Sequence, residues 1–513
     1  MKTSTKLVIL VLTSITLNIG PRTLNCYANK LTIGSLTIDQ AAQTIQIKVA
    51  WENSWRFNSS TLPYNWDAAW IFVKFRDCSS DPQTTQFTQG IVSTTLTDHN
   101  WDVLGDGQRF EATKADGTAG IDVATNNTGV MLRPNTEGTF AQISDTILLK
   151  ITNLPTSGTY DIRVFGIEMV FVPSSGGGFS SFNVGDGNGV TFSTNALGQP
   201  FPVGEATPLT ISSEAAIIVN STSNISSCCN NGSSSTVQAG FPKGFNSFYI
   251  MKYEITQGQY ADFLNSVSED MATNTLWTGT YNQFRHMINN TGTAPQKYST
   301  TRVDRACNYL SWSRVSAYLD WACLRPLTEM QYEKAGRGFA AKLLNEFAWG
   351  TTSITYPAAG GISGAENGTE TITTANANAN GNAVAWSSGD GGGIRGPLRA
   401  GIFATATSTR QLSGGSYFGA MELTGNVREF YIGICAGDAG GEVCASGISL
   451  GDGTLAATGY HNTADWPSGS APADGHVVVR GGSWNAVTYL SDRNNGNPCV
   501  VTQDNTIGGR GGR

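Results

Sequence analysis

The stretch "YLSWSRVSAYLDWACLRPLTEMQYEKAGRG", residues 309–338, predicts two successive helices. In its first half, apolar residues recur at the three- and four-residue spacing of one helix face, namely Val315, Tyr318, Leu319 and Ala322. In its second half, Thr328 can cap a helix and Gln331 stands three residues later, as in a capping box. We therefore expect a helix over residues 313–324 and a second helix that begins near residue 328.

The flanking residues extend this mixed pattern. Upstream, "FYIMKYEIT" (248–256) predicts a strand that ends where Thr256 can cap a helix over "QGQYADFLNSV" (257–267). Beyond Gly338 the chain is rich in glycine and has few regular elements. The low-complexity segment 220–236 indicates a mobile insertion. Residues 165–513 are therefore expected to form an irregular α+β domain.

The N-terminal part shows strand signals and almost no helical periodicity. "QTIQIKVAW" (43–51) alternates, "AAWIFVKF" (68–75) is typical of a buried strand, and residues 146–167 indicate two strands joined by a Pro- and Gly-containing turn. We predict an antiparallel β-sandwich over residues 29–164. Its first third contains four tryptophans, for which core packing is favoured over a carbohydrate platform: Trp51, Trp55, Trp66 and Trp70.

The first residues predict export. Two lysines, an apolar run and small residues before Asn29 are typical of a signal peptide over residues 1–28. That run is too short for a membrane span, and no later run is long enough. We therefore expect a secreted or cell-surface protein without a membrane span. Lipidation of Cys26 is the alternative at this end.

Composition excludes one class of partner. The formal net charge is −7 and only 14% of residues are charged, so no basic stripe is available to gather phosphates. Nucleic acid is therefore not an expected partner.

The cysteine count favours disulfides in an exported chain, because eight of the nine cysteines remain once Cys26 is set aside. Cys435 and Cys444 are the most plausible pair, since the Gly-rich interval between them can turn back. The four histidines are scattered and are interpreted as surface or packing residues: His99, His286, His461 and His476.

An ordered set of motifs carries a family resemblance. "MVFVP" (169–173), "YIMKYEITQGQYADFLN" (249–265), residues 309–338, "FAWG" (347–350), "MELTGNVREF" (421–430) and "VVRGGSWN" (478–485) occur in this order. Together they resemble the formylglycine-generating enzyme family, also called the sulfatase-modifying-factor domain. The resemblance implies a calcium-stabilised fold related to the C-type lectins.

The family's copper chemistry has no ligands here. The resemblance implies oxidation of a sulfatase cysteine by copper held between two thiolates, three and eight residues after the serine of the R-G-G-S motif. Counted from Ser483, these positions are Ala486 and Ser491. Neither residue offers the soft sulfur donor that copper(I) requires, and Cys499 alone cannot supply two. We therefore expect no copper and no formylglycine formation.

The sequence also lacks the motifs of two other catalytic sites. A second branch of the family uses iron held by histidines, but no HxxxHxE pattern is present. No G-x-S-x-G elbow of a hydrolase occurs either.

Calcium ligands match the family pattern better. In "ELTGNVRE" the resemblance implies carboxylates from Glu422 and Glu429 and carbonyls from Gly425 and Val427, a hard-oxygen set suited to Ca²⁺. The alternative is that both glutamates pair with an arginine, Arg428 or Arg493.

A second calcium site is matched only by spacing. Asn376 and Asp390 are fourteen residues apart, with Ala377 and Gly392 as carbonyl donors. Because this region is rich in Asn and Gly, coincidence is the alternative.

We predict a non-catalytic binding or structural protein whose ligand is a protein or a glycan. Loops around residues 484–506 would form the binding surface, with four candidate contact residues: Arg428, Trp484, Asp492 and Arg493. Two alternatives stay open. One is an oxidoreductase of this family with an unrecognised metal site, and the other is a subunit that assembles with itself in a surface layer or filament.

Overall fold

The computed structural model describes most of the chain from residue 24 onward. The parts outside the description are residues 1–23, 27–30, 58–63, 123–126, 176–180, 187–192, 195–206, 221–233, 386–394, 406, 434–446, 471–476 and 493–501. Expected features that fall on these residues, among them Cys435, Cys444 and Cys499, lie outside the described residues.

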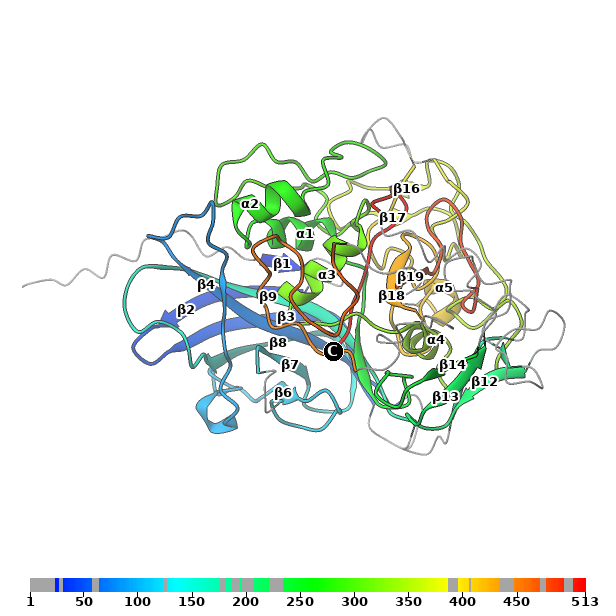
Figure 1. Ribbon diagram of the computed structural model, residues 1–513, viewed down its shortest axis with the longest axis horizontal. Coiled ribbons are helices and arrows are strands. Elements are labelled where there is room, and N and C mark those ends of the chain that lie inside the picture. Colours follow the sequence, from blue (N-terminus) through cyan, green and yellow to red (C-terminus); the bar gives the residue numbers. More distant parts are fainter. Residues whose placement is uncertain are drawn as a thin grey trace, which may run out of the picture.

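Two antiparallel sheets form the N-terminal part (Figure 1). One has the order β1-β2-β3-β8, made of Leu24–Cys26, Leu31–Asp39, Thr44–Arg56 and Gly138–Lys150. The other has the order β15-β9-β4-β7-β6, made of Phe248–Met251, Tyr160–Val172, Asp67–Asp77, Gly129–Pro134 and Phe110–Thr113, and β5 (Thr88–Gln89) pairs with β4. The expected strand-rich N-terminal region is confirmed.

The middle of strand β4, from Ala68 to Val73, is apolar on both faces because both faces are buried. Ala69, Ile71 and Val73 belong to the core between the two sheets. Ala68 and Phe72 point the other way, into a core shared with the helices. Alternation of side chains along a strand makes such a two-sided run necessary when both faces are covered.

Three of the four tryptophans expected to pack in the core are buried, and Trp55 is partly buried. Trp51 stacks on Phe110 inside the sandwich, with ring centroids 4.7 Å apart. Trp66 stacks on Phe171 on the opposite face of the sheet, with centroids 4.1 Å apart. Trp70 is 1% exposed. None of these three offers a carbohydrate platform.

Strand β9 joins the two parts of the chain. It runs through the expected boundary between residues 164 and 165, and its second half pairs with β15 from Met169↔Met251 to Val172↔Phe248. One sheet therefore contains strands from both expected domains. The core on its outer face also combines residues of both parts, as with Phe165 and Trp321, whose ring centroids are 4.9 Å apart.

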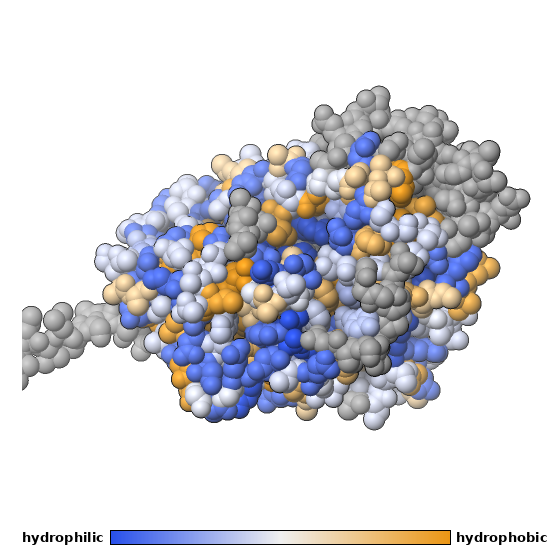
Figure 2. All heavy atoms as spheres, turned by 90° about the horizontal axis from the view of Figure 1, so that it is seen from below, coloured by the Kyte–Doolittle hydropathy of each residue, from blue (hydrophilic) through white to orange (hydrophobic). Residues whose placement is uncertain are grey.

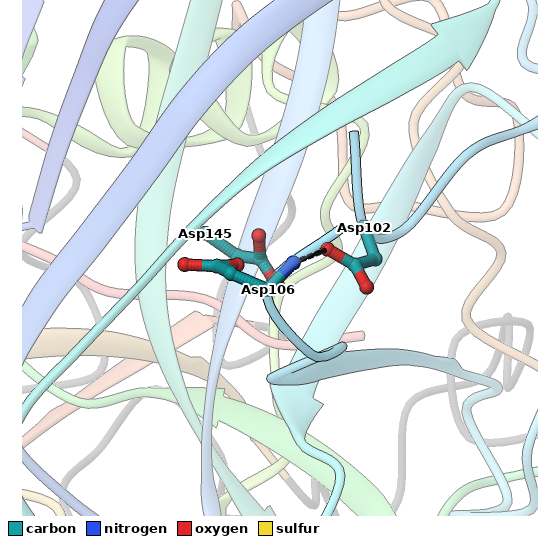
Figure 3. Close-up of side chains that lie close together, drawn as sticks. All are labelled: Asp102, Asp106 and Asp145. Carbon is teal, nitrogen blue, oxygen red and sulfur yellow. Dashed lines mark hydrogen bonds between the residues drawn. The ribbon is translucent and has the colours of Figure 1, made fainter. Parts of the chain in front are cut away.

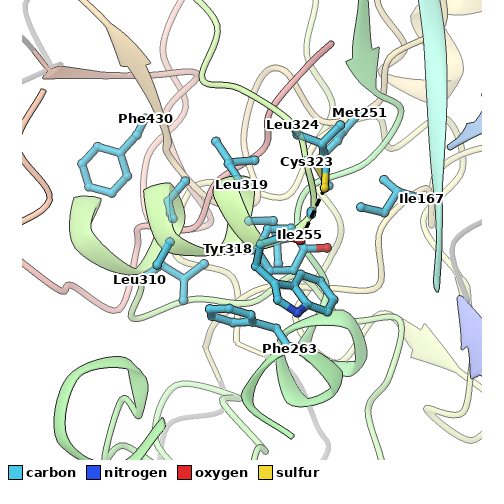
Figure 4. Packing of buried hydrophobic residues seen from close by; sticks show 14 of the residues in the cluster. Ile167, Met251, Ile255, Phe263, Leu310, Tyr318, Leu319, Cys323, Leu324 and Phe430 are labelled. Carbon is cyan, nitrogen blue, oxygen red and sulfur yellow. Dashed lines mark hydrogen bonds between the residues drawn. The ribbon is translucent and has the colours of Figure 1, made fainter. Parts of the chain in front are cut away.

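Two helices, α1 (Gln257–Leu264) and α3 (Trp312–Trp321), cover this outer face. Helix α4 (Glu329–Arg337) packs Tyr332 and Ala335 against the opposite face of β9 and β15. Shorter helical pieces are η1 (Leu96–Asp98), α2 (Glu269–Met271), the π-helical turn η2 (Ala272–Leu276) and α5 (Arg410–Ser413). Figure 4 shows Tyr318 and Leu319 of α3 packed among residues of α1 and β15. Both predicted caps are confirmed, since Thr256 and Thr328 each close a capping box.

Short strand pairs complete the C-terminal part. These are β10 (Phe182–Val184), β12 (Thr207–Ile211) and β11 (Ser193–Thr194), then β13 (Ile217–Asn220) with β14 (Ser234–Val237), β16 (Ile362–Ser363) with β17 (Thr371–Ile372), and β18 (Glu429–Ile432) with β19 (Val477–Arg480). The predicted insertion 220–236 thus begins and ends in a hairpin, and its middle, 221–233, lies outside the described residues.

The last residues run through the centre of the structure. Residues 506–513 are buried, and Gly512 bridges to both Ile250 and Arg325. The Arg513 guanidinium lies 3.8 Å from the ring centroid of Trp70. The C-terminal segment therefore ties β15 and β4 together.

Surface and cysteine features follow from the composition. Figure 2 shows hydrophobic residues in small groups among hydrophilic ones on the face it displays. Within the described ranges, Cys78, Cys307 and Cys323 are free thiols. A search of the helices in the described residues found none with the length and hydropathy of a membrane span.

Candidate functional site

Ser491, at the second expected copper-ligand position, is a buried part of a polar cluster. Its hydroxyl donates to Glu333 (2.7 Å) and accepts from the Arg337 guanidinium (2.6 Å). Glu333 also accepts from Arg480 (2.9 Å) and from the Gly185 amide (2.8 Å). Burial alone would raise the pKa of Glu333, but the two guanidinium groups hold it below its usual value. Ser491 thus bridges two ionised groups, which gives it a structural role.

Ala486, at the first copper-ligand position, differs from Ser491 in environment. Its side chain is exposed, while Ser491 has no exposed area. The Ala486 carbonyl accepts from the Ser483 amide (2.7 Å) and closes a tight turn. A methyl group and a hydroxyl engaged with two charged partners provide no copper ligand at these positions.

Glu429, an expected calcium ligand, contacts the buried guanidinium of Arg510. Oε1 accepts from Nε (2.7 Å) and Nη2 (2.6 Å) of Arg510, and Oε2 accepts from the Tyr431 hydroxyl. The same guanidinium donates to the carbonyls of Met251 (3.0 Å) and Met421 (2.6 Å). An arginine partner for Glu429 was foreseen, but the partner is Arg510.

Glu422, the other expected carboxylate, has one engaged oxygen and one without a partner. Oε1 accepts from the Gly401 amide (2.7 Å), whereas the buried Oε2 has no hydrogen-bond partner among the residues that the structure describes. Burial raises the pKa of Glu422 to about 7, against the influence of Arg510.

Glu254 is a third buried carboxylate in this region, and the sequence analysis did not single it out. It accepts from the Val427 amide (3.0 Å) and from the Asn426 side chain (2.6 Å). Burial, followed by the charges of Glu422 and Glu429, raises its pKa well above the usual value. Three buried carboxylates lie here, and Arg510 and Arg399 supply positive charge only in part, so the region favours an additional proton or cation. Two signals pointed to it: Glu254 lies two residues before the predicted helix cap at Thr256, and it belongs to the family motif at 249–265.

The contacts of these residues indicate which of their oxygen atoms are available to bind calcium. The unpartnered Glu422 Oε2 lies in the region expected to bind it, as do the carbonyls of Gly425 and Val427, which accept no hydrogen bond among the described residues. Glu429 fits less well, because both of its oxygens already accept hydrogen bonds. The first calcium site stays a prediction, centred on Glu422.

The second calcium site cannot be assembled from the described residues. Asn376 is exposed, with a φ of 61°, and Ala377 is buried. Asp390 and Gly392 lie outside the described ranges.

The expected ligand-binding residues occupy different environments. Trp484 is 4% exposed, and its indole donates to the Asn505 carbonyl (2.9 Å). Arg428 and Asp492 are half-buried, and Arg493 lies outside the described ranges. The Trp484 ring stacks on Phe284, with centroids 5.5 Å apart. Phe284 was not singled out from the sequence, because its segment shows no regular periodicity.

An acidic cluster lies on the N-terminal part, on the sandwich (Figure 3). One carboxylate oxygen each from Asp102, Asp106 and Asp145 lie within 4.8 Å of one another. Asp106 also forms an ion pair with Arg109 (2.8 Å), and Asp145 accepts from the Arg109 amide (2.9 Å). Arg109 and the loop amides thus already satisfy part of this cluster.

Comparison with known protein families gives a match over the C-terminal part of the chain. A family model described as the sulfatase-modifying factor enzyme 1-like domain matches residues 231–510, more than half of the chain. A search of curated proteins gave no match.

Proposed function

The chain belongs to the sulfatase-modifying-factor family, and from this premise we propose that it is a secreted or cell-surface recognition protein without the family's copper chemistry. The observation that carries the proposal is the environment of Ser491. This residue lies where the resemblance places a thiolate, and its hydroxyl links Arg337 to Glu333 inside the protein. The loops around residues 484–506, anchored by the buried Trp484, are the proposed recognition surface.

We also propose a structural calcium ion in a C-type-lectin-like scaffold. Glu422 Oε2 and the carbonyls of Gly425 and Val427 would hold it. Bound calcium would offset the negative charge of Glu254, Glu422 and Glu429 that Arg510 and Arg399 leave uncompensated. Its role in this proposal is stability.

Metal analysis of the purified full chain tests the recognition proposal. We expect no stoichiometric copper or iron after either metal is supplied and the excess removed. Copper or iron at one equivalent would favour the alternative of an oxidoreductase with an unrecognised metal site.

Thermal unfolding tests the calcium proposal. A chelator should lower the unfolding temperature and calcium should restore it, because a ligand that binds only the native state stabilises it. Glu422→Gln should blunt this response. Asp106→Asn, in the exposed acidic cluster, is the matched control and should leave the response intact. A calcium response lost in Asp106→Asn and retained in Glu422→Gln would move the site to the sandwich.

A further inference from the structure

The turn at residues 281–286 lies against the proposed recognition surface and has an unusual backbone. Asn282, Phe284 and Arg285 have φ values of 62°, 43° and 66°. Asn accepts this region readily, but Phe and Arg rarely adopt it, at a cost of about 1 kcal/mol or more for each residue. A strained conformation persists only when its surroundings hold it, and such strain is concentrated at functional sites.

Buried side chains on the inner side of the turn form hydrogen bonds with its backbone. The Arg285 carbonyl accepts from the side chains of Arg305 (2.9 Å) and Gln257 (2.9 Å). The Arg285 guanidinium points inward and pairs with Glu366. The Phe284 carbonyl accepts from Asn308 (3.0 Å). With Arg285 anchored inside, the preceding residues are forced outward.

The outer side of the turn presents aromatic and amide groups. Tyr281 is 49% exposed, and Asn282 and Gln283 are exposed beside it. Phe284 is half-buried and stacks on Trp484, which fixes its ring. Tyr309 lies within reach of Gln283, with its hydroxyl 3.5 Å from the Gln283 side-chain oxygen.

Two charged groups near the turn form hydrogen bonds within the protein. The Asp504 carboxylate accepts from the Thr506 amide (2.7 Å). The Arg314 guanidinium donates to the carbonyls of Leu276 (3.0 Å) and Trp277 (3.0 Å). The turn itself therefore offers ring faces and amides, and these two ionic groups are engaged within the protein, while Arg395 stands exposed next to Gly396, which packs against the Phe284 carbonyl.

We infer that this aromatic turn, residues 281–284 resting on Trp484, binds a neutral oligosaccharide. The Tyr281 ring would cover the apolar face of a sugar ring, while the amides of Asn282 and Gln283 would bond its hydroxyls. Amides can both donate and accept, as hydroxyl groups require. The strained turn would be pre-organised for its ligand, so binding would cost little ordering. This inference rests on the proposed recognition function and names its ligand class.

The full chain should be tested on an array of neutral and acidic oligosaccharides, followed by calorimetry with the strongest neutral binder. We expect binding that Tyr281→Ala weakens at least about tenfold, the loss typical of a central interface aromatic. Phe57→Ala is the matched control: this aromatic residue, 36% exposed at the end of β3, should bind as the unmodified chain does. Binding should also change less than about twofold in 1 M salt, since no charge pairing contributes.

Three results would overturn the ligand class: no neutral oligosaccharide bound, binding confined to acidic ones, or binding unaffected by Tyr281→Ala. A defined peptide that binds in their place and depends on Tyr281 would also overturn it, while leaving the recognition function in force. Conversion of a cysteine peptide to an aldehyde would contradict the recognition function itself and is measured independently.

Discussion

The segment 481–492 contacts two different regions of the molecule, a buried polar cluster around Ser491 and the turn next to Trp484. These two regions differ in how their polar groups are paired. On one side Ser491 belongs to a buried cluster in which Glu333 receives hydrogen bonds from four groups. On the other side Trp484 supports a turn with strained backbone and exposed Tyr281. The inward side holds the second of the two expected copper-ligand positions, Ser491, whose hydroxyl is engaged by Arg337 and Glu333.

This difference indicates where function can reside. A buried cluster whose charges neutralise one another stabilises the fold and leaves no atom available to a substrate. A surface held in a costly conformation by contacts beneath it is suited to binding. The pKa values of two buried carboxylates show the same contrast between the polar cluster and the region near the turn. Glu333 has a lowered pKa, while burial raises the pKa of Asp304, near Arg399 on the side of the turn, to about 8.

The largest expected effect is at Glu333. Glu333→Ala leaves the buried guanidinium groups of Arg337 and Arg480 short of a partner, so the free energy of unfolding should fall by about 3–5 kcal/mol. Urea denaturation measures it. Glu269→Gln is the control, because its ion pair with Lys297 (2.7 Å) is partly exposed and is worth at most about 1 kcal/mol. Equal losses of unfolding free energy in the two variants would show that the buried cluster contributes no more to stability than a partly exposed ion pair does.

The pH dependence of stability should reflect Asp304. Within the described part of the chain its Oδ1 is buried without a hydrogen-bond partner. Its folded pKa of about 8 exceeds the usual 3.8, so the folded state binds its proton more tightly than the unfolded chain does. This contribution to the free energy of unfolding therefore falls as pH rises from 6 to 8, by about 2 kcal/mol. Asp304→Asn should flatten the profile over this window. An identical profile in variant and unmodified chain would show that Asp304 is ionised in the folded protein.

Ser491→Ala should have a smaller effect. It removes one hydroxyl between Glu333 and Arg337 but leaves their direct ion pair (3.0 Å) in place. We expect a loss of about 1.5 kcal/mol in the free energy of unfolding, typical of a hydrogen bond to a charged group. Ala486→Ser, at the exposed position, is the control and should change stability by less than about 0.5 kcal/mol. No loss in Ser491→Ala would mean that the hydroxyl is dispensable to the cluster.

The smallest effect on stability is expected at Tyr281. Because its side chain is 49% exposed, Tyr281→Ala should change the free energy of unfolding by less than about 0.5 kcal/mol. Thermal unfolding measures this directly. A much larger loss would mean that Tyr281 supports the turn, and its effect on binding would then be indirect.

Local sequence signals predicted the elements well. The caps at Thr256 and Thr328 were predicted because capping boxes depend on residues three positions apart. The two-sided burial of β4 was visible as a continuous apolar run. The pairing of β9 with β15 was not, because it joins segments about eighty residues apart and leaves no local pattern.

The site was predicted in part. The family spacing identified Ser491 and Glu429, but their partners Arg337 and Arg510 are brought together only by the fold. The strained turn was missed, since positive φ at Phe284 comes from the anchoring of Arg285 and has no signature in the sequence. Contacts between distant residues, which the sequence does not encode locally, account for both omissions.

The most direct test of the central claim is mass spectrometry of a cysteine-containing sulfatase peptide incubated with the full chain, copper and oxygen. We predict that the cysteine stays unchanged, because Ala486 is a methyl group and the Ser491 hydroxyl is engaged by Arg337 and Glu333. Appearance of the aldehyde would contradict the account and restore an oxidoreductase function to the chain.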